Sequence, residues 1–258
     1  MIPLVLLLLA LSLPVPALEA KDDTGTRVIL NAPARRIVTL APHATELILA
    51  LGQEERLVAV APYSEVPPAL TDLPRLGGLG GLDRERLLQL QPDLVVAWGS
   101  GNRPGDLHWL RRAGIALYVT EPRTLDDIAR ALLDLGRLTG DPAAGRQAAA
   151  RFRRRLDTAC PSKGTQARRP VYYEIWPSPP MTIGGRHWLN DLLKRAGLRN
   201  IFDDVPRGLI TVSRESILAR PHELTLSTSG RGDLPLDATL GRPGPRIVEG
   251  LEKLCDRL

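Results

Sequence analysis

The sequence predicts an α/β protein of two lobes, each with a parallel sheet covered by helices, joined by a long rigid α-helix. Three observations support this fold class. Strand patterns alternate with helix patterns in both halves of the chain, residues 124–160 are almost entirely helical in pattern, and one segment of the first half is nearly repeated in the second. The length of 258 residues suits two domains, and a hydrophobic content of 43% is typical of a folded protein.

Residues 1–20 are predicted to be a signal peptide for secretion. The apolar run from Ile2 to Leu13 is too short to span a bilayer comfortably and is followed by small residues, so we expect cleavage after Ala17 or Ala20. No Lys or Arg precedes the run, which leaves an uncleaved anchor as the alternative. No cysteine stands directly after the run, so a bacterial lipid anchor at that point is not supported.

Residues 21–123 are predicted to form the N-terminal lobe. Strand patterns alternate there with short helix patterns, and no Asn-Gly hairpin turn occurs, so a parallel sheet covered by helices is expected. Strands are expected at residues 26–30, 36–40, 57–64, 93–101 and 115–122, and helices at 45–51, 83–90 and 106–114.

A helical connector is predicted at residues 124–160. Two amphipathic helix patterns follow each other, with Thr124 and Asp141 as N-cap residues and Pro142 at a first helical position. The segment is rich in Ala, Leu and Arg, unlike a flexible linker, so it should be stiff. The remaining residues, 161–258, are expected to form the C-terminal α/β lobe.

A near-repeat relates the two lobes. The stretch DRERLLQLQPDLVVAWGSG (83–101) and the stretch SRESILARPHELTLSTSG (213–230) share the order of cap, Arg-Glu, two aliphatic residues, Pro, strand and Gly. Because the copies lie on opposite sides of the connector, they predict similar lobes related by a pseudo-twofold axis. Glu85 and Glu215 would then occupy equivalent positions, one on each lobe.

Charge and cysteine content restrict the classes of partner. The formal net charge is +5, but the arginines are spread along the chain and no basic run is interleaved with aromatic residues, so no nucleic-acid binding is predicted. Cys160 and Cys255 could form a disulfide in an exported protein, or could remain two unpaired thiols.

No pattern for catalysis or for a protein-built metal site stands out. The histidines show neither HxH nor HExxH spacing. His43, which follows a strand end, is expected to donate a hydrogen bond in a cleft or to be a turn residue that faces solvent. Neither a GxSxG elbow nor a nucleotide-binding glycine motif is present. We therefore expect a binding protein and not an enzyme, with no metal and no cofactor.

Five stretches together resemble the periplasmic cobalamin-binding proteins of bacterial vitamin B12 uptake, within the wider family of helical-backbone substrate-binding proteins. They are RIVTLAPHATELILALG, VAVAPYSEVPP, LDRERLLQLQPDLVVAW, NIFDD and VSRESILARP. The resemblance implies a ligand cleft between the lobes, cobalamin or a related corrinoid as the ligand, a periplasmic location, and delivery to the permease subunits of an ABC importer in the inner membrane. A monomer is expected.

The resemblance also implies roles for individual residues. Glu85 and Glu215 match the family's glutamates that dock onto permease arginines through charge-assisted hydrogen bonds. Tyr63 and Trp98, both at strand ends, match aromatic positions that pack on the corrin face. The other expected ligand contacts are His43, Leu79, Met181, Leu209 and Arg242.

The expected pocket departs from the family pattern. Leu79 and Leu209 stand near tryptophan positions of the family and Met181 at a phenylalanine position, so the pocket should be apolar but poorer in aromatic rings. The chain after the second repeat is also shorter, which predicts a smaller C-terminal lobe. One alternative is a haem or ferric-siderophore binder, with Arg186 and Arg207 as candidate partners of an anionic siderophore. Another is a transporter accessory or adaptor that binds no small molecule.

Overall fold

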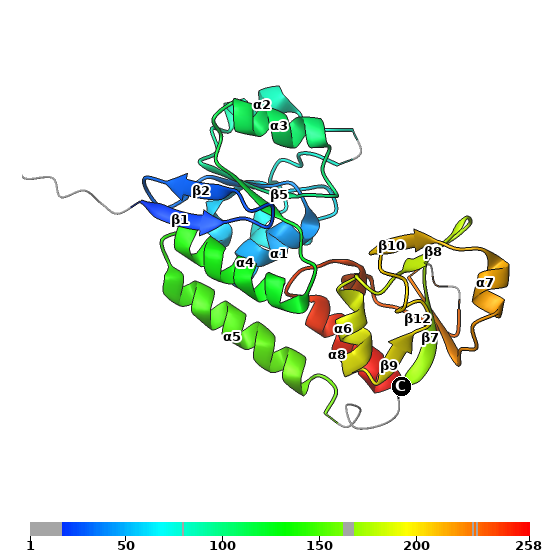
Figure 1. The fold of residues 1–258 in the computed structure, drawn as a ribbon. Helices are drawn as coiled ribbons and strands as arrows, with labels where there is room; N and C mark the ends of the chain where they lie inside the picture. Colours follow the sequence, from blue (N-terminus) through cyan, green and yellow to red (C-terminus); the bar gives the residue numbers. More distant parts are fainter. Residues whose placement is uncertain (1–16, 79, 162–167, 229, 231) are drawn as a thin grey trace, which may run out of the picture.

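The computed structural model describes residues 17–258 except 79, 162–167, 229 and 231, and it has two α/β lobes joined by helices (Figure 1). The predicted two-lobed α/β fold class is confirmed. Each lobe is built on its own sheet, and the helices of the connector lie along one side of the molecule. Among the described helices, none combines the length and the apolar character needed to cross a membrane.

The N-terminal lobe is built on a parallel sheet with the strand order β4-β3-β5-β6. Helices cover both faces, because Val96 of β5 packs in the core beside α1, whereas Val95 packs in the core beside α2 and α3. The elements are β3 (Ile37–Thr39), α1 (Pro42–Ala50), η1 (Glu54–Arg56), β4 (Leu57–Ala59), η2 (Pro68–Leu70), α2 (Arg84–Gln89), β5 (Leu94–Trp98), α3 (Pro104–Arg112) and β6 (Leu117–Thr120).

An antiparallel hairpin of β1 (Leu18–Lys21) and β2 (Arg27–Leu30) precedes this sheet. Ala20 and Val28 are buried in the main hydrophobic core. The strand β1 thus overlaps the segment assigned to a signal peptide. Removal after Ala17 would leave β1 whole, whereas removal after Ala20 would take three of its four residues.

The connector is a hairpin of two helices, which corrects the expectation of one long helix. These helices are α4 (Leu125–Leu138) and α5 (Pro142–Thr158). Gly140, with a backbone φ of +75°, ends α4 and reverses the chain. At the other end of the hairpin, Arg153 of α5 donates to Asp126 of α4 at 3.0 Å. Thr124 and Asp141 are the N-caps, as predicted, since their side chains accept backbone N–H groups of the first turns.

The C-terminal lobe has a mixed sheet in the order β10-β8-β7-β11-β12, with β9 also paired to β7. Its strands are β7 (Arg169–Pro177), β8 (Pro180–Ile183), β9 (Leu198–Asn200), β10 (Leu209–Thr211), β11 (Leu224–Ser227) and β12 (Leu234–Pro235). The pairs β7–β8 and β8–β10 are antiparallel. The expectation of a parallel sheet therefore needs correction here, because only two residues separate β7 from β8 and so short a turn joins antiparallel strands.

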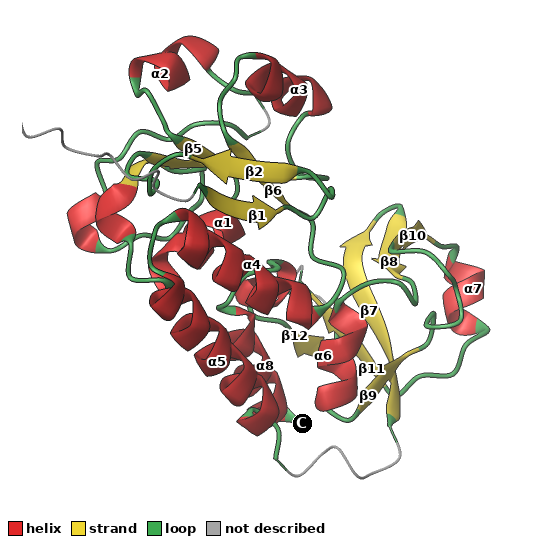
Figure 2. Cartoon of the chain, turned by 60° about the vertical axis from the view of Figure 1, so that its left-hand side comes forward, coloured by secondary structure: helices red, strands yellow, loops and turns green. Residues whose placement is uncertain are grey.

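The helices of the C-terminal lobe are α6 (Leu189–Arg195), α7 (Arg214–Leu218) and α8 (Ile247–Arg257), and the 3-10 turn η3 (Ala238–Gly241) precedes α8. The helix α8 returns to the connector and packs beside α5 (Figure 2). A disulfide between Cys160 and Cys255, whose Cα atoms are 5.7 Å apart, ties the segment after α5 to α8.

One hydrophobic core continues from lobe to lobe through this junction. It includes Tyr118 of β6, Leu132 of α4, Leu251 of α8 and Tyr173 of β7. Arg155 of α5 also binds Glu252 of α8 at 2.8 Å. Because core packing resists continuous deformation, the junction should hold the lobes facing each other.

Candidate ligand-binding cleft

A cleft of about 620 Å³ lies between the lobes. The N-terminal lobe contributes residues that follow the carboxyl ends of β5 and β6, where ligand sites of parallel sheets gather. The C-terminal lobe contributes the segment that precedes α6, the segment that leads into β10, and Pro243 before α8. The lining residues are Trp98, Ser100, Glu121, Pro122, Arg123, Arg186, His187, Trp188, Pro206, Arg207, Gly208, Leu209 and Pro243.

Trp98 is the aromatic residue of the N-terminal wall. It ends β5, and its backbone N–H donates to Asn102 Oδ1 at 2.7 Å, while Asn102 Nδ2 donates to the Leu40 carbonyl at 2.8 Å. Gly101 makes room for the indole, since a Cβ there would lie 1.9 Å from Trp98 Cε3. The loop thus holds a half-buried indole in place at the edge of the cleft.

His43 lies beneath Trp98 and is fully buried. Its ring packs edge-on against the indole, with the centroids 5.2 Å apart, and its Nε2 is 2.7 Å from Thr120 Oγ1. Burial lowers the pKa of His43 to about 3, so the imidazole is uncharged at neutral pH. His43 is therefore placed to support Trp98 from below, which corrects the expectation that it lies on the surface of the cleft.

His187 and Trp188 form the aromatic part of the C-terminal wall. Their ring centroids are 5.0 Å apart, and His187 Nδ1 accepts the backbone N–H of Leu189 at 3.2 Å. Burial lowers the pKa of His187 to about 4, which keeps it uncharged at neutral pH. Each lobe thus places one indole at the cleft, but Trp98 is half-buried whereas only 8% of the surface of Trp188 is exposed.

Arginine dominates the polar part of the lining. Arg123 comes from the N-terminal lobe, and Arg186 and Arg207 come from the C-terminal lobe. The carboxylate of Glu121 is engaged locally, since it accepts the Ser100 N–H at 2.6 Å and the Ser100 hydroxyl at 3.0 Å. With His187 uncharged, the lining residues carry a formal charge of +2 at neutral pH.

The residues expected to bind ligand from the sequence are dispersed. Trp98 and Leu209 lie in the lining. Tyr63 lies outside it, 86% exposed on a loop where its backbone φ is +62°. Met181 lies in β8, where it pairs with Thr211 and Trp176. Leu79 lies outside the described residues.

Arg242 belongs to a cluster of charges where the two lobes meet. It donates to Glu65 at 3.0 Å and lies 3.9 Å from Glu46. Arg246 also donates to Glu65 and binds Glu249 at 3.2 Å. The arginines precede α8, while Glu46 belongs to α1 and Glu65 follows β4, so the cluster links the C-terminal segment to the N-terminal lobe.

Glu46 is the buried member of this cluster, with 4% of its surface exposed. Burial raises the pKa of Glu46 to about 7, although Arg246 and Arg242 act in the opposite direction. Gly244 packs directly against it, since a Cβ there would lie 2.2 Å from Glu46 Oε2. Glu65 is exposed and held by Arg246, which lowers the pKa of its carboxyl.

Several cleft residues were not singled out as ligand contacts from the sequence. Glu121 and Arg123 follow β6 just as Ser100 follows β5, so their position at a strand end was a usable signal. Trp188 precedes a helix and carried no such signal. Within the described ranges, no three His, Cys, Asp or Glu side chains gather closely enough to hold a metal ion.

The near-repeat forms equivalent helices on the outer parts of both lobes (Figure 1). Asp83 caps α2 and Ser213 caps α7, each by accepting the backbone N–H three residues later. Glu85 and Glu215 occupy the first turns and are exposed. One turn after them, the chain exposes Leu88 (53%) and Leu218 (82%).

Comparison with known proteins shows which family has this architecture. Residues 37–234 match the model of the periplasmic binding protein family. The vitamin B12-binding protein of Vibrio cholerae is 32% identical over 247 residues, which cover 88% of this chain and 90% of that protein.

Solved structures agree with this match. The crystal structure of the periplasmic vitamin B12 binding protein of Vibrio cholerae is 31% identical and superposes with a TM-score of 0.77, covering 87% of this chain and 96% of that one. A periplasmic heme binding protein from Pseudomonas aeruginosa is 26% identical, with a TM-score of 0.74 and coverage of 87% and 92%. The chain belongs to the periplasmic binding protein family.

Proposed function

We propose that this protein binds cobalamin or a related corrinoid in the cleft and delivers it to the permease of an ABC importer. The observation that carries the proposal is a cleft of about 620 Å³ between the lobes, with the half-buried Trp98 on one wall and the edge of the largely buried Trp188 on the other. The half-buried indole of Trp98 offers a planar macrocycle an apolar contact with little loss of rotamer entropy. The similarity to the Vibrio cholerae vitamin B12-binding protein supports this ligand class.

Binding would involve little movement of the lobes. The continuous core, the α4–α5 hairpin and the Cys160–Cys255 disulfide all resist hinge bending. A ligand in such a cleft would be released faster if a partner pushed the lobes apart. Contact with the permease at both lobes would supply that force.

Glu85 and Glu215 are the proposed contacts with permease arginines. Both are exposed, and neither has an ion-pair partner among the described residues. Their position on α2 and α7, one helix on each lobe, suits a partner that contacts both lobes at once. Leu88 and Leu218 lie on the same helix faces, one turn further on, and would add an apolar contact beside each carboxylate.

Export to the periplasm would be directed by the N-terminal segment, which is then removed. Cleavage after Ala17 is the better of the two expected positions, because it retains the whole of β1 and the buried Ala20. We propose that the mature protein acts as a monomer, since one copy supplies both walls of the cleft. Its role is binding and release, without chemistry on the ligand.

Titration with cyanocobalamin, followed by tryptophan fluorescence and by melting temperature, tests the ligand. Wild type should bind and melt at a higher temperature, because a ligand that binds only the folded state stabilises it. Trp98→Ala should weaken binding about tenfold or more. Trp176→Ala, which removes an exposed tryptophan outside the cleft lining, is the matched control and should bind as wild type does.

Haem is the alternative ligand, favoured by the positive charge of the cleft and by the likeness to the Pseudomonas aeruginosa heme binding protein. Haem carries two carboxylates that arginines could bind. A parallel titration with haemin decides between them: tighter binding of haemin than of cyanocobalamin would replace the corrinoid proposal. No shift in melting temperature with either compound would favour an accessory protein without a ligand.

A further inference from the structure

Three arginines of the cleft stand out by their lack of partners. Within the described residues, the guanidinium groups of Arg123, Arg186 and Arg207 form no ion pair and no hydrogen bond, although all three line the cleft. Elsewhere arginine is commonly paired: Arg130 binds Asp23 at 2.7 Å, and Arg220 binds Asp204 at 2.6 Å. The cleft therefore keeps its positive charge available.

Two of these arginines are held close together by the backbone. The Arg186 N–H donates to the Arg207 carbonyl at 3.0 Å, and the Gly185 N–H donates to the Val205 carbonyl at 2.7 Å. Gly185 permits the approach, since a Cβ there would lie 2.1 Å from the Asp203 carbonyl oxygen. Like charges that start from adjacent backbone segments repel each other, so an anion between them would be favoured.

The third arginine comes from the opposite wall. Arg123 directly precedes Thr124, the N-cap of α4, and its backbone N–H donates to Asp127 at 2.8 Å, which fixes the position of its backbone. A cleft whose lining carries a net positive charge concentrates that potential in the space between its walls. An anionic group in the ligand would meet guanidinium groups from both lobes.

We infer that these arginines select a corrinoid that carries a phosphodiester, a complete cobalamin with its nucleotide loop, over the same ring without it. This inference rests on the proposed function. The planar guanidinium fork matches the geometry of phosphate oxygens, and arginine is always charged. Cobinamide has the same corrin ring as cobalamin but lacks the phosphodiester and the nucleotide, so the two compounds separate recognition of the ring from recognition of the nucleotide loop. The arginine variants then single out the phosphodiester within that loop.

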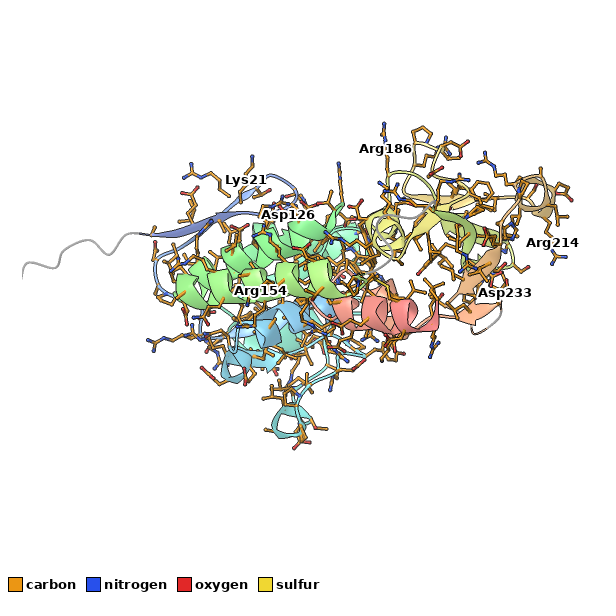
Figure 3. All side chains as sticks on the ribbon, turned by 90° about the horizontal axis from the view of Figure 1, so that it is seen from below. Lys21, Asp126, Arg154, Arg186, Arg214 and Asp233 are labelled. Carbon is orange, nitrogen blue, oxygen red and sulfur yellow. A yellow bond between two sulfur atoms is a disulfide. The ribbon has the colours of Figure 1, made fainter. Side chains whose placement is uncertain are left out.

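The test measures the dissociation constants of cyanocobalamin and dicyanocobinamide by calorimetry at low and at physiological salt. Wild type should prefer cobalamin, and raising the salt should reduce the preference. In the Arg186→Gln, Arg207→Gln double variant, the affinity for cobalamin should fall by about two- to fivefold per arginine, while the affinity for cobinamide stays the same. Arg154→Gln is the control, because Figure 3 places Arg154 on α5 of the connector, whereas Arg186 lies on the C-terminal lobe.

Each outcome has a separate meaning. A preference for cobalamin that disappears in the double variant and persists in Arg154→Gln supports the inference. Equal affinities for the two compounds in wild type, or an equal loss for both in the double variant, would overturn it and leave the proposed function intact. Failure of both compounds to bind wild type would overturn the proposed function itself.

Discussion

The two lobes share a near-repeat of sequence but differ in the core that covers the outer face of each sheet. In the N-terminal lobe, α2 and α3 cover a buried cluster of Val38, Leu40, Ala59, Leu76, Leu87, Val95, Ala97, Leu107, Leu110, Leu117 and Val119. In the described part of the C-terminal lobe, the corresponding cluster has Tyr172, Ile201 and Phe202 as its buried members. Equivalent local sequence therefore forms equivalent helices without building an equivalent core.

Equivalent positions of the repeat show the difference directly. Leu87 of α2 is 0% exposed, whereas its counterpart Ile217 of α7 is only half-buried. The exposed positions of the two copies agree better, since Glu85 and Glu215 both lie in the first turn of their helices. The C-terminal lobe thus retains the proposed docking helix α7, but the hydrophobic cluster beneath that helix is smaller than the one beneath α2.

The largest expected effect is on stability, when the equivalent core residues of α2 and α7 are truncated. Leu87→Ala should lower the free energy of unfolding by about 2–5 kcal/mol, because it opens a cavity in a closed cluster. Ile217→Ala should cost about 1 kcal/mol, because that side chain already contacts solvent. Urea unfolding of both variants measures the difference, and equal losses would show that the outer layers are equally packed.

Removal of the disulfide should come next. The double variant Cys160→Ser, Cys255→Ser should lose about 2–4 kcal/mol in the free energy of unfolding, since the bond closes a long loop. Hydrogen exchange should rise more in the C-terminal lobe, whose last helix the disulfide anchors, than in the N-terminal sheet. Wild type under reducing conditions is the control, and it should behave like the variant. A loss spread evenly over both lobes would contradict the proposed role of the bond.

The charge cluster between the lobes should make stability depend on pH. Because burial raises the pKa of Glu46 to about 7 from an ordinary 4.5, the fold favours the protonated form, and stability falls as pH rises between these values. The free energy of unfolding of Glu46→Gln minus that of wild type should therefore be about 1–3 kcal/mol more favourable at pH 8 than at pH 4.

Comparing wild type with Glu46→Gln at each pH separates the effect of Glu46 ionisation on stability from the effects of the charged groups around it. These are Arg242, Arg246 and Glu65, and Arg246 also binds Glu249. Glu65 has a lowered pKa, so its own contribution is lost as pH falls, but it is present in both proteins and cancels. A difference that does not change with pH would show that Glu46 ionises normally.

The smallest expected effects test whether the lobes are equivalent in docking. Glu85→Gln and Glu215→Gln should each weaken binding to a cobalamin importer permease in nanodiscs by about 1 kcal/mol, and both should leave cobalamin affinity unchanged. Glu55→Gln, an exposed glutamate on η1, is the matched control. An effect from one lobe alone would show that the partner contacts the lobes unequally.

Much of the fold could be predicted because it depends on local spacing. The strand and helix order of the N-terminal lobe, the caps Thr124 and Asp141 and the near-repeat all follow from patterns a few residues long. The helix hairpin in place of one long helix and the antiparallel β7–β8 pair were missed, because each depends on how the chain turns between elements.

The residues of the cleft also divide into those that the sequence could place and those that it could not. Trp98 could be placed at the cleft because it ends a parallel strand, yet His43 and Tyr63, which also follow strands, lie beneath the wall and outside the lining. The arginines at positions 123, 186 and 207 come from three separated segments and meet only through packing. The sequence by itself determined most elements of the N-terminal lobe, the N-caps of the connector and the two-lobed plan, because periodicity, capping and the near-repeat can be read along the chain. Only the tertiary structure decided which side chains face the cleft, because burial depends on contacts between residues far apart in the chain.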